Sequence, residues 1–378
     1  MFWQPYLYRR DDSMTLNSTY RLDLPKAGVV GSLFLQMSSD EVSGLAQTGG
    51  KWRLADYIDK IEVIGNGATV IASLTGFQVQ AFAFYDQGVV SPDVIRNYAT
   101  NTQFARFLLN FGRSMTDPDL ALDLSKWDNV ELRITNSATA SQFQTDIKCT
   151  TVLLEQRPAT QARALGFLKK EIWRSYTTVQ NEWQYLELPT ENIIRRILLQ
   201  AIPHYDPTTH AADTTFFNLL YDIQHYLLTG EQEVFSGRGS DLALLNYLYY
   251  GKDVLAHGHP YVNADVALPT GVGYPLAHVA TPASYSGSAE TLVTTLTAGQ
   301  TADTIQFEQA VGAGPDEMLV KGYGYHDTLV INHDWDSDPN TWLNPSAMKQ
   351  VLLNLHARDS SSAANGTVYV VLDRLVRM

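Results

Sequence analysis

The sequence has very little cysteine and no long apolar run. Cys149 is the single cysteine among 378 residues, so an intramolecular disulfide is excluded, and we expect it to be a small buried apolar residue. No stretch approaches the roughly 18 apolar residues of a membrane-spanning helix. The first residues lack the basic region and the apolar run of about 7–15 residues that mark a secretory signal. We therefore expect a soluble protein made in the cytoplasm.

Basic residues are also scarce. The chain has 27 Lys and Arg against 40 Asp and Glu, a net charge of −13, which argues against nucleic-acid binding by the surface as a whole. Hydrophobic residues make up 45% and charged residues 18%, which is typical of a folded protein, and the 20 tyrosines favour strands. Because 378 residues exceed the usual size of one hydrophobic core, we expect two domains.

One tetrapeptide pattern occurs twice and marks an internal duplication. Leu22-Asp23-Leu24-Pro25 and Leu186-Glu187-Leu188-Pro189 are 164 residues apart, and the apolar runs behind them end at Gln36 and Gln200. Further matches follow in the same order, at separations of 163 and then 221 residues. This period is too long for a solenoid or propeller blade and indicates two domains of one fold. The matched pairs are Asp59 with Asp222, Gly67 with Gly230, Ser73 with Ser236, Gly76 with Gly239, Gly88 with Gly251, Val130 with Val351 and Ile147 with Val368.

The first half reads as eight short strands with helical interruptions. Asn66-Gly67 predicts a type I′ hairpin turn, because this turn needs two residues at positive φ. Helical spacing predicts a helix over 77–87, and Ser91-Pro92-Asp93 predicts the start of a second one. Eight antiparallel strands are typical of a sandwich or jelly roll. The predicted strands are 20–24, 29–38, 58–64, 69–74, 106–111, 120–124, 129–135 and 145–155.

The second half repeats this pattern after a connection. Residues 1–19 are interpreted as an N-terminal arm, 20–157 as the first jelly roll, 158–174 as an amphipathic linker helix and 175–378 as the second jelly roll. The linker helix is predicted from Leu165, Leu168 and Ile172, at spacings of three and four. The predicted elements of the second half are strands at 185–188, 194–202, 222–228, 232–236, 317–323, 328–333, 350–356 and 366–375 and a helix over 241–250.

The second copy carries an insertion. Gly88 and Val130 are 42 residues apart, whereas their counterparts Gly251 and Val351 are 100 apart. No Lys or Arg occurs from Asp253 to Val320. A connection this long inside a domain usually has a function or its own structure, so we expect a surface projection at about 252–316 with a few strands.

No catalytic, cofactor-binding or metal-binding residues are predicted. Asp334, Asp336 and Asp338 alternate as in a calcium loop, but Pro339 and Pro345 stand where that loop needs Gly and Glu. A solvated acidic loop is the preferred interpretation, with an incidental cation site as the alternative. The histidines do not match a zinc or cupin-type ligand set, whether His257 and His259 in the insertion or His278, His326 and His333 elsewhere. The Gly-rich pieces lack the lysine of a phosphate cradle, and no Gly-x-Ser-x-Gly elbow occurs.

Basic residues cluster at the ends of the predicted domains. In a jelly roll the first and last strands are antiparallel neighbours, so these groups are expected on one side of the molecule, opposite the insertion. Scattered solvated charge is the alternative. The residues are Arg9, Arg10, Arg157, Arg163, Lys169, Lys170, Arg174, Arg374 and Arg377.

Two tandem eight-stranded domains with helices in each and one elaborated loop resemble the double jelly-roll major capsid proteins of tailless icosahedral viruses. That family includes coat proteins of bacteriophages with an internal membrane and adenovirus hexon. The resemblance covers about Tyr20 to Arg374 and rests on this architecture, on Leu22-Asp23-Leu24-Pro25 with its repeat, on Asp59-Lys60-Ile61 and on Asn66-Gly67. The length and compact loops are more similar to a phage protein than to a hexon.

The resemblance implies a structural protein without catalysis. Three copies would form a homotrimeric capsomer whose six similar domains fill hexagonal lattice positions. It further implies neighbouring capsomers, penton and minor capsid proteins as partners and a place in the virion. The basic side would face an internal membrane or the genome, and the insertion would form an outward tower, confined to the second copy.

Two other classes remain as alternatives. A viral spike or carbohydrate-binding protein would use exposed aromatic residues as stacking platforms, and the competing interpretation of the same residues is core or interface. Tandem jelly rolls also occur in secreted glycan amidases and copper monooxygenases, but their usual signal peptides are not found, nor are the disulfides and ligands of the copper enzymes. The candidate aromatic residues are Tyr323, Tyr325, Trp335 and Trp342.

Overall fold

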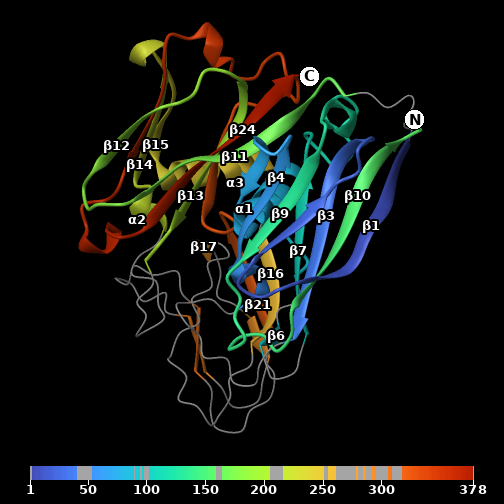
Figure 1. The fold of residues 1–378 in the computed structure, drawn as a ribbon. Helices are drawn as coiled ribbons and strands as arrows, with labels where there is room; N and C mark the ends of the chain where they lie inside the picture. Colours follow the sequence, from blue (N-terminus) through green and yellow to red (C-terminus); the bar gives the residue numbers. More distant parts are fainter. Residues whose placement is uncertain are drawn as a thin grey trace.

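The computed structural model describes the ranges 2–40, 53–88, 90–93, 96–97, 102–158, 164–204, 216–250, 254–260, 278–279, 284–286, 291–294, 305–308 and 317–377. The chain folds into two jelly rolls, which lie side by side in Figure 1. This confirms the predicted all-β class with two tandem domains.

The first jelly roll is built from two four-stranded sheets. One sheet has the order β1-β10-β3-β7, and the other has the order β2-β9-β4-β5. The two-residue strand β8 (Leu122–Asp123) pairs with β3 outside this set. The strands are β1 (Phe2–Met14), β2 (Thr19–Asp23), β3 (Val29–Asp40), β4 (Ile58–Gly65), β5 (Thr69–Leu74), β7 (Thr102–Asn110), β9 (Val130–Asn136) and β10 (Ile147–Arg157).

The second jelly roll repeats this topology strand for strand. Its sheets have the orders β11-β24-β13-β22 and β12-β23-β14-β15. A helix of 12 residues follows the fifth strand in each copy, α1 (Gly76–Gln87) in the first and α3 (Gly239–Tyr250) in the second. The strands are β11 (Gly166–Thr177), β12 (Trp183–Glu187), β13 (Ile193–Ile202), β14 (Asp222–Leu227), β15 (Gln232–Arg238), β22 (Thr328–Asn332), β23 (Val351–His356) and β24 (Thr367–Arg377).

The predicted duplication is confirmed in register. The two tetrapeptides end β2 and β12, and the apolar runs behind them form β3 and β13. Asn66 and Gly67 have φ values of 51° and 74°, as the predicted hairpin turn requires, and the matched Gly230 has φ 90°. The short helices are α2 (Phe216–Leu219) and the 3-10 segments Leu54–Tyr57, Leu124–Lys126, Leu228–Gly230, Pro345–Ala347 and Ser361–Ala363.

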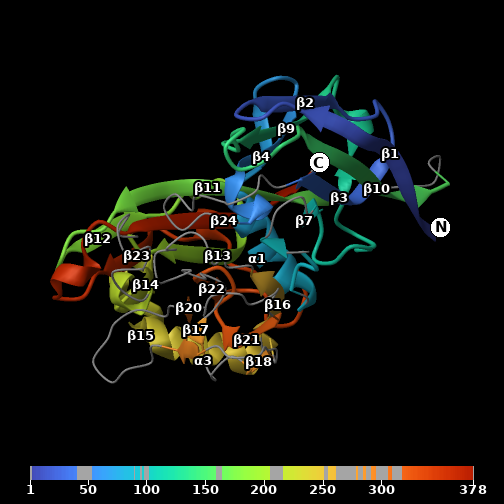
Figure 2. The same cartoon turned by 90° about the horizontal axis from the view of Figure 1, so that it is seen from below.

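One continuous sheet joins the two domains. β5, an edge strand of the first jelly roll, pairs in parallel with β11, an edge strand of the second, at Lys170↔Ala72 and Glu171↔Ser73. The result is an eight-stranded sheet that runs from β2 to β22. α1 lies between the two domains, whereas α3 lies at the outer side of the second one (Figure 2). The two domains therefore share a sheet and a helix-filled junction.

The predicted N-terminal arm is wrong, because residues 2–14 form β1. This strand is a mostly exposed edge, and its register with β10 shifts between Leu7 and Arg9 and again between Arg9 and Asp12. Such bulges break the alternation of side chains by which a strand is recognised in a sequence. β1 is the first strand of the first jelly roll.

The predicted linker helix over 158–174 is also wrong, because its described part from Gly166 onward is β11. This strand is covered on both faces. Phe167 and Ile172 contact the core cluster of the first domain, whereas Trp173 contacts that of the second. A strand buried on both sides loses its alternation, and its apolar residues then show the three-and-four spacing of a helix.

Two smaller predictions for the first half also fail. Ser91-Pro92-Asp93 do not start a helix, since their backbone is irregular and the Ser91 hydroxyl donates to the Arg106 carbonyl at 2.7 Å. The predicted strand 120–124 shrinks to the two residues of β8. The count of eight strands is kept only because β1 takes the place of that strand.

The insertion contains strands, as predicted, and is described only at those strands. One of them, β16, pairs in parallel with β6 (Arg96–Asn97), which belongs to the first copy, so the projection is not confined to the second copy. β6, β16 and β21 lie at the end of the molecule opposite the two termini (Figure 1). No described helix is long and apolar enough to cross a membrane. The strands of the insertion are β16 (Val254–Pro260), β17 (His278–Val279), β18 (Ser284–Ser286), β19 (Thr291–Thr294), β20 (Ile305–Glu308) and β21 (Glu317–Tyr323).

Candidate assembly site

The junction between the domains is organised by α1. The hydroxyl of Thr75 accepts from the Gln78 backbone, the Gln78 side chain accepts from the Thr75 backbone, and Gly88 ends the helix at φ 64°. These caps satisfy backbone groups that a helix end leaves without partners. α1 is buried on both sides, since Val79 packs into its own domain while Phe82 lies over the Lys170 ammonium of the second domain at 5.2 Å.

α1 covers the outer face of the sheet β11-β24-β13-β22. Across these strands, a row of side chains runs from Ile172 through Val371 and Leu198 to Val330. The last three belong to the buried core of the first domain, although the second domain supplies them. Tyr85 adds a hydrogen bond from its hydroxyl to the Thr328 carbonyl, at 2.9 Å.

A buried ionic cluster lies beside this apolar row. Asp86, at the end of α1, contacts Lys170 Nζ at 3.1 Å and Arg195 Nη1 at 3.0 Å, and it also pairs with Arg196. Asp373 accepts from both arginines, and Asp334 completes the set at 2.7 Å from Arg195. Three carboxylates thus balance three cations, so the charges can stay buried. We call these six residues the junction ionic cluster.

The pKa directions in this cluster follow from burial and charge. Burial by itself raises the pKa of Asp86, but the charges of Arg196, Lys170 and Arg195 outweigh it and hold that pKa below its ordinary value. Burial lowers the pKa of Lys170, against the opposing effect of Asp86 and Asp373. The cluster ties a helix of one domain to three strands of the other.

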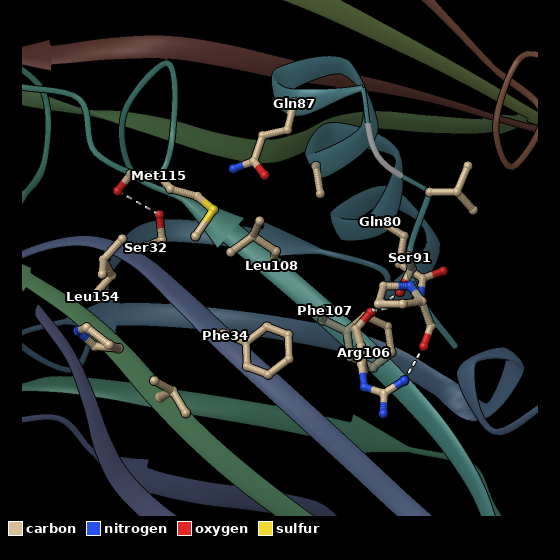
Figure 3. A pocket seen from close by; sticks show the side chains of 15 residues that line it. Ser32, Phe34, Gln80, Gln87, Ser91, Arg106, Phe107, Leu108, Met115 and Leu154 are labelled. Atoms are coloured by element: carbon tan, nitrogen blue, oxygen red, sulfur yellow. Dashed lines mark hydrogen bonds between the residues drawn. The ribbon is translucent and has the colours of Figure 1, made fainter. Parts of the chain in front are cut away.

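The first jelly roll carries an open groove on the corresponding face of its own first sheet. The groove has a volume of about 340 Å³ and lies between the sheet β1-β10-β3-β7, α1 and residues 90–92. Phe34 and Leu108 point into it from β3 and β7, with Arg106 at one end (Figure 3). Its lining is mainly apolar, which is typical of a surface that binds another apolar group. The lining residues are Pro5, Ser32, Phe34, Gln80, Ala83, Gln87, Val90, Ser91, Pro92, Arg106, Phe107, Leu108, Met115, Val152 and Leu154.

The predicted basic groups share one end of the fold, but two of the most central are not surface charges. Phe2 pairs with Arg157 and Gly166 pairs with Arg377, so the domain ends do emerge together. Lys170 is fully buried in the junction ionic cluster, and Arg374 is buried beside Glu171. Of the remaining groups, Arg9, Arg10, Arg174 and Arg377 are exposed, Arg157 and Lys169 are half-buried, and Arg163 lies outside the described residues.

The acidic trio is split by the fold. Asp334 is buried and accepts from the indole of Trp342 at 2.8 Å, which corrects the expectation that all three are solvated. Asp336 and Asp338 are in the exposed part of the loop, where Asp336 accepts from Thr341 at 2.7 Å. Within the described residues, no three His, Cys, Asp or Glu side chains gather as metal ligands would.

The histidines and aromatic residues singled out in the sequence are mostly internal. His326 stacks on Phe77 at 4.5 Å, and the His333 ring lies 5.3 Å from that of His225. Tyr325 and Trp342 are buried, Trp335 is exposed, and the side chains of Tyr323, His257, His259 and His278 lie outside the described residues.

Sequence reasoning missed Arg195 and Arg196 as functional residues. Two adjacent arginines inside the apolar run Ile193–Ile202 could have revealed a buried ionic site, because unpaired charges are almost never buried in a strand. The role of α1 was missed too, since the sequence does not say which helix is covered.

Structural comparison gives the fold an independent match. The chain is similar to the STIV MCP, a crystal structure, at 10% identity and a TM-score of 0.58, over 100% of this chain and 97% of that one. It is similar to the major capsid protein of bacteriophage PM2 at 8% identity and a TM-score of 0.54, over 99% and 98% of the two chains. It is also similar to the PBCV-1 virus capsid at 10% identity and a TM-score of 0.55, over 99% and 93%. No protein-family model and no curated protein sequence matches the chain. With two complete jelly rolls in tandem and a match over its whole length, the chain has the double jelly-roll fold of viral major capsid proteins.

Proposed function

We propose that this protein is the major structural protein of an icosahedral viral shell and that three copies assemble into a pseudo-hexameric capsomer. The observation that carries this proposal is the duplication itself. Two complete jelly rolls of identical topology are joined side by side in one sheet, and the arrangement covers full-length capsid proteins from end to end. Its role is assembly, without catalysis.

The geometry gives the duplication a purpose. One chain presents two similar domains, so a ring of three chains presents six and can occupy a site of hexagonal symmetry. Closed rings of identical subunits are the ordinary outcome when one surface binds a different surface of the next copy and the rotation closes. An enzyme would gain no comparable advantage from two copies of the whole fold.

The remaining partners follow from the same assembly. Neighbouring capsomers would contact the rim of the trimer, and penton and minor capsid proteins would fill positions that the trimer cannot. The domain ends, with Arg9, Arg10, Arg174 and Arg377 exposed, would face an internal membrane or the genome, and the projection would point outward. The protein would be made in the host cytoplasm and reside in the virion.

The test is the mass of the purified protein by light scattering, followed by negative-stain imaging. The chain has a mass of 42.1 kDa, so a trimer (3 × 42.1 kDa) has about 126 kDa. We expect that mass at micromolar concentration and a particle of hexagonal outline. A monomer at the same concentration would overturn the proposal.

A further inference from the structure

We infer that α3 of one copy packs into the groove of the first jelly roll of a second copy, as α1 packs onto the second jelly roll within the chain. The inference rests on the proposed trimer and names the surfaces that hold it together. It starts from the internal duplication, which gives every residue of the buried domain junction a counterpart elsewhere on the same chain.

The two helices have equivalent positions and opposite exposure. Counterparts differ by 163 residues, as for Gly76 and Gly239. Tyr85 is 6% exposed and its counterpart Leu248 is 67% exposed, although both are large. The face of α3 that corresponds to the buried face of α1 is therefore apolar and uncovered. Its exposed residues are Leu244, Leu245, Tyr247, Leu248 and Tyr249, the counterparts of Ala81, Phe82, Phe84, Tyr85 and Asp86.

The two sheets show the same relation. The row that α1 covers on the second domain has its counterpart in a row that runs from Leu7 through Val152 and Phe34 to Leu108. Phe34 and Leu198 are 164 residues apart, which is the separation of β3 and β13. Leu198 is fully buried, whereas Phe34 is half-buried and lines the open groove.

Charge has been removed from both surfaces together. At the junction, Asp86 of α1 faces Lys170, Arg196 and Asp373. The counterpart of Asp86 is Tyr249, and the counterparts of the three sheet residues, in the same order, are Pro5, Ser32 and Leu154. A lone carboxylate on α3 or lone cations in the groove would be costly to bury. The absence of charge on both sides is what a mutual interface requires.

Volume points the same way. On the second domain, the space between α3 and the sheet is filled by Phe84 and Tyr85 of α1, which leaves about 10 Å³. The matching space on the first domain is the groove of about 340 Å³. The counterparts of Phe84 and Tyr85 are Tyr247 and Leu248, which are exposed and therefore able to fill it from a neighbouring copy.

The sheet edges complete the match. β5 and β11 are the edges that pair at the junction, and their counterparts β15 and β1 end their sheets without a further strand among the described residues. Each copy thus offers one helix with an edge strand and one groove with an edge strand. Such a head-to-tail contact closes into a ring if the rotation permits, and every junction of that ring has the same construction as the one inside the chain.

The first experiment changes either side of the contact by one charge. We compare Leu248→Glu on α3 and Phe34→Glu in the groove with Val179→Glu, which alters an equally apolar, 53% exposed residue away from both surfaces. We expect the mass to fall from about 126 kDa (3 × 42.1 kDa) to 42.1 kDa in the first two variants and to stay unchanged in the third. Circular dichroism should show that all three remain folded.

The second experiment tests proximity and needs no loss of assembly. Tyr85 lies against Thr328 at the junction, and the counterparts of these residues are Leu248 and Arg106. The double variant Leu248→Cys/Arg106→Cys, treated with a short bismaleimide, should give covalent chains of two and three copies on a denaturing gel. Cys149 is buried, so the parent chain provides no competing thiol. Each single variant should remain uncrosslinked.

The outcomes separate the two proposals. A trimeric parent whose Leu248→Glu and Phe34→Glu variants stay trimeric, with no crosslink in the double variant, would overturn the inferred contact and leave the capsomer proposal standing. A monomeric parent would overturn both.

Discussion

His333 makes the second jelly roll sensitive to acid. Its ring lies 5.3 Å from that of His225, and neither Nε2 atom has a hydrogen-bond partner among the described residues. Burial, together with the neighbouring imidazole, lowers the pKa of His333 from 6.5 to about 3. Burial also lowers the pKa of His225, against its hydrogen bond to the Leu352 carbonyl. The folded state therefore holds both rings neutral over a pH range in which the unfolded chain binds protons.

The sign and size of the effect follow from this difference. Because the folded pKa lies below the unfolded one, the contribution to stability is complete above pH 6.5 and is lost as the pH falls toward 3. Each pH unit corresponds to about 1.4 kcal/mol. At pH 4.5 the loss from His333 alone is therefore about 2.7 kcal/mol, or roughly 5–10 °C in Tm for a domain of this size.

The assay compares urea unfolding of the parent and His333→Phe at pH 7 and pH 4.5. Phenylalanine keeps the ring but cannot be protonated, so the free energy of unfolding of the variant should fall by about 2.7 kcal/mol less than that of the parent between the two pH values. The double variant His225→Phe/His333→Phe should be flatter still. Equal losses in parent and variants would refute the reasoning, because they would place the acid sensitivity in the carboxylates.

Other perturbations probe the junction and the duplicated turns. Asp86→Asn leaves buried cations without their carboxylate and should cost about 3–5 kcal/mol in urea unfolding, whereas exposed Asp338→Asn should change stability by less than about 0.5 kcal/mol; equal effects would contradict the cluster. Phe82→Ala removes a 2% exposed ring from the junction and should cost about 3–5 kcal/mol by the same measurement; a loss below about 1 kcal/mol would show that the domains do not depend on this contact. Gly67→Ala and Gly230→Ala place a side chain at φ 74° and 90° and should each lower stability by about 1–2 kcal/mol, although a Cβ would contact no atom within 4 Å; unchanged melting temperatures would show that these turns relax freely.

Much of the fold could be predicted because the duplication repeats local signals. Leu22-Asp23-Leu24-Pro25 and its repeat mark the second strand of each jelly roll, and Asn66-Gly67 marks a turn that only residues at positive φ can form. Two matched stretches constrain each other, so an error in one copy is corrected by the other. The 12-residue helices α1 and α3 were predicted nearly to their ends for this reason.

The failures share a physical cause, which is contact with a distant part of the chain. β11 was interpreted as a helix because two different cores cover its faces, and β1 as an arm because bulges interrupt its pairing with β10. Lys170 was counted as a surface charge because the sequence does not show that Asp86, 84 residues earlier, lies 3.1 Å away.

The sequence by itself determined the class of fold, the duplication and the resemblance to capsid proteins, because strand alternation, turn residues and repeated spacing are local properties. Only the tertiary structure decided which of two equivalent helices is covered. α1 and α3 are both rich in apolar residues, and the difference between them appears when the second domain packs onto one and leaves the other exposed. Burial is a property of what lies opposite in space, and no local pattern records it.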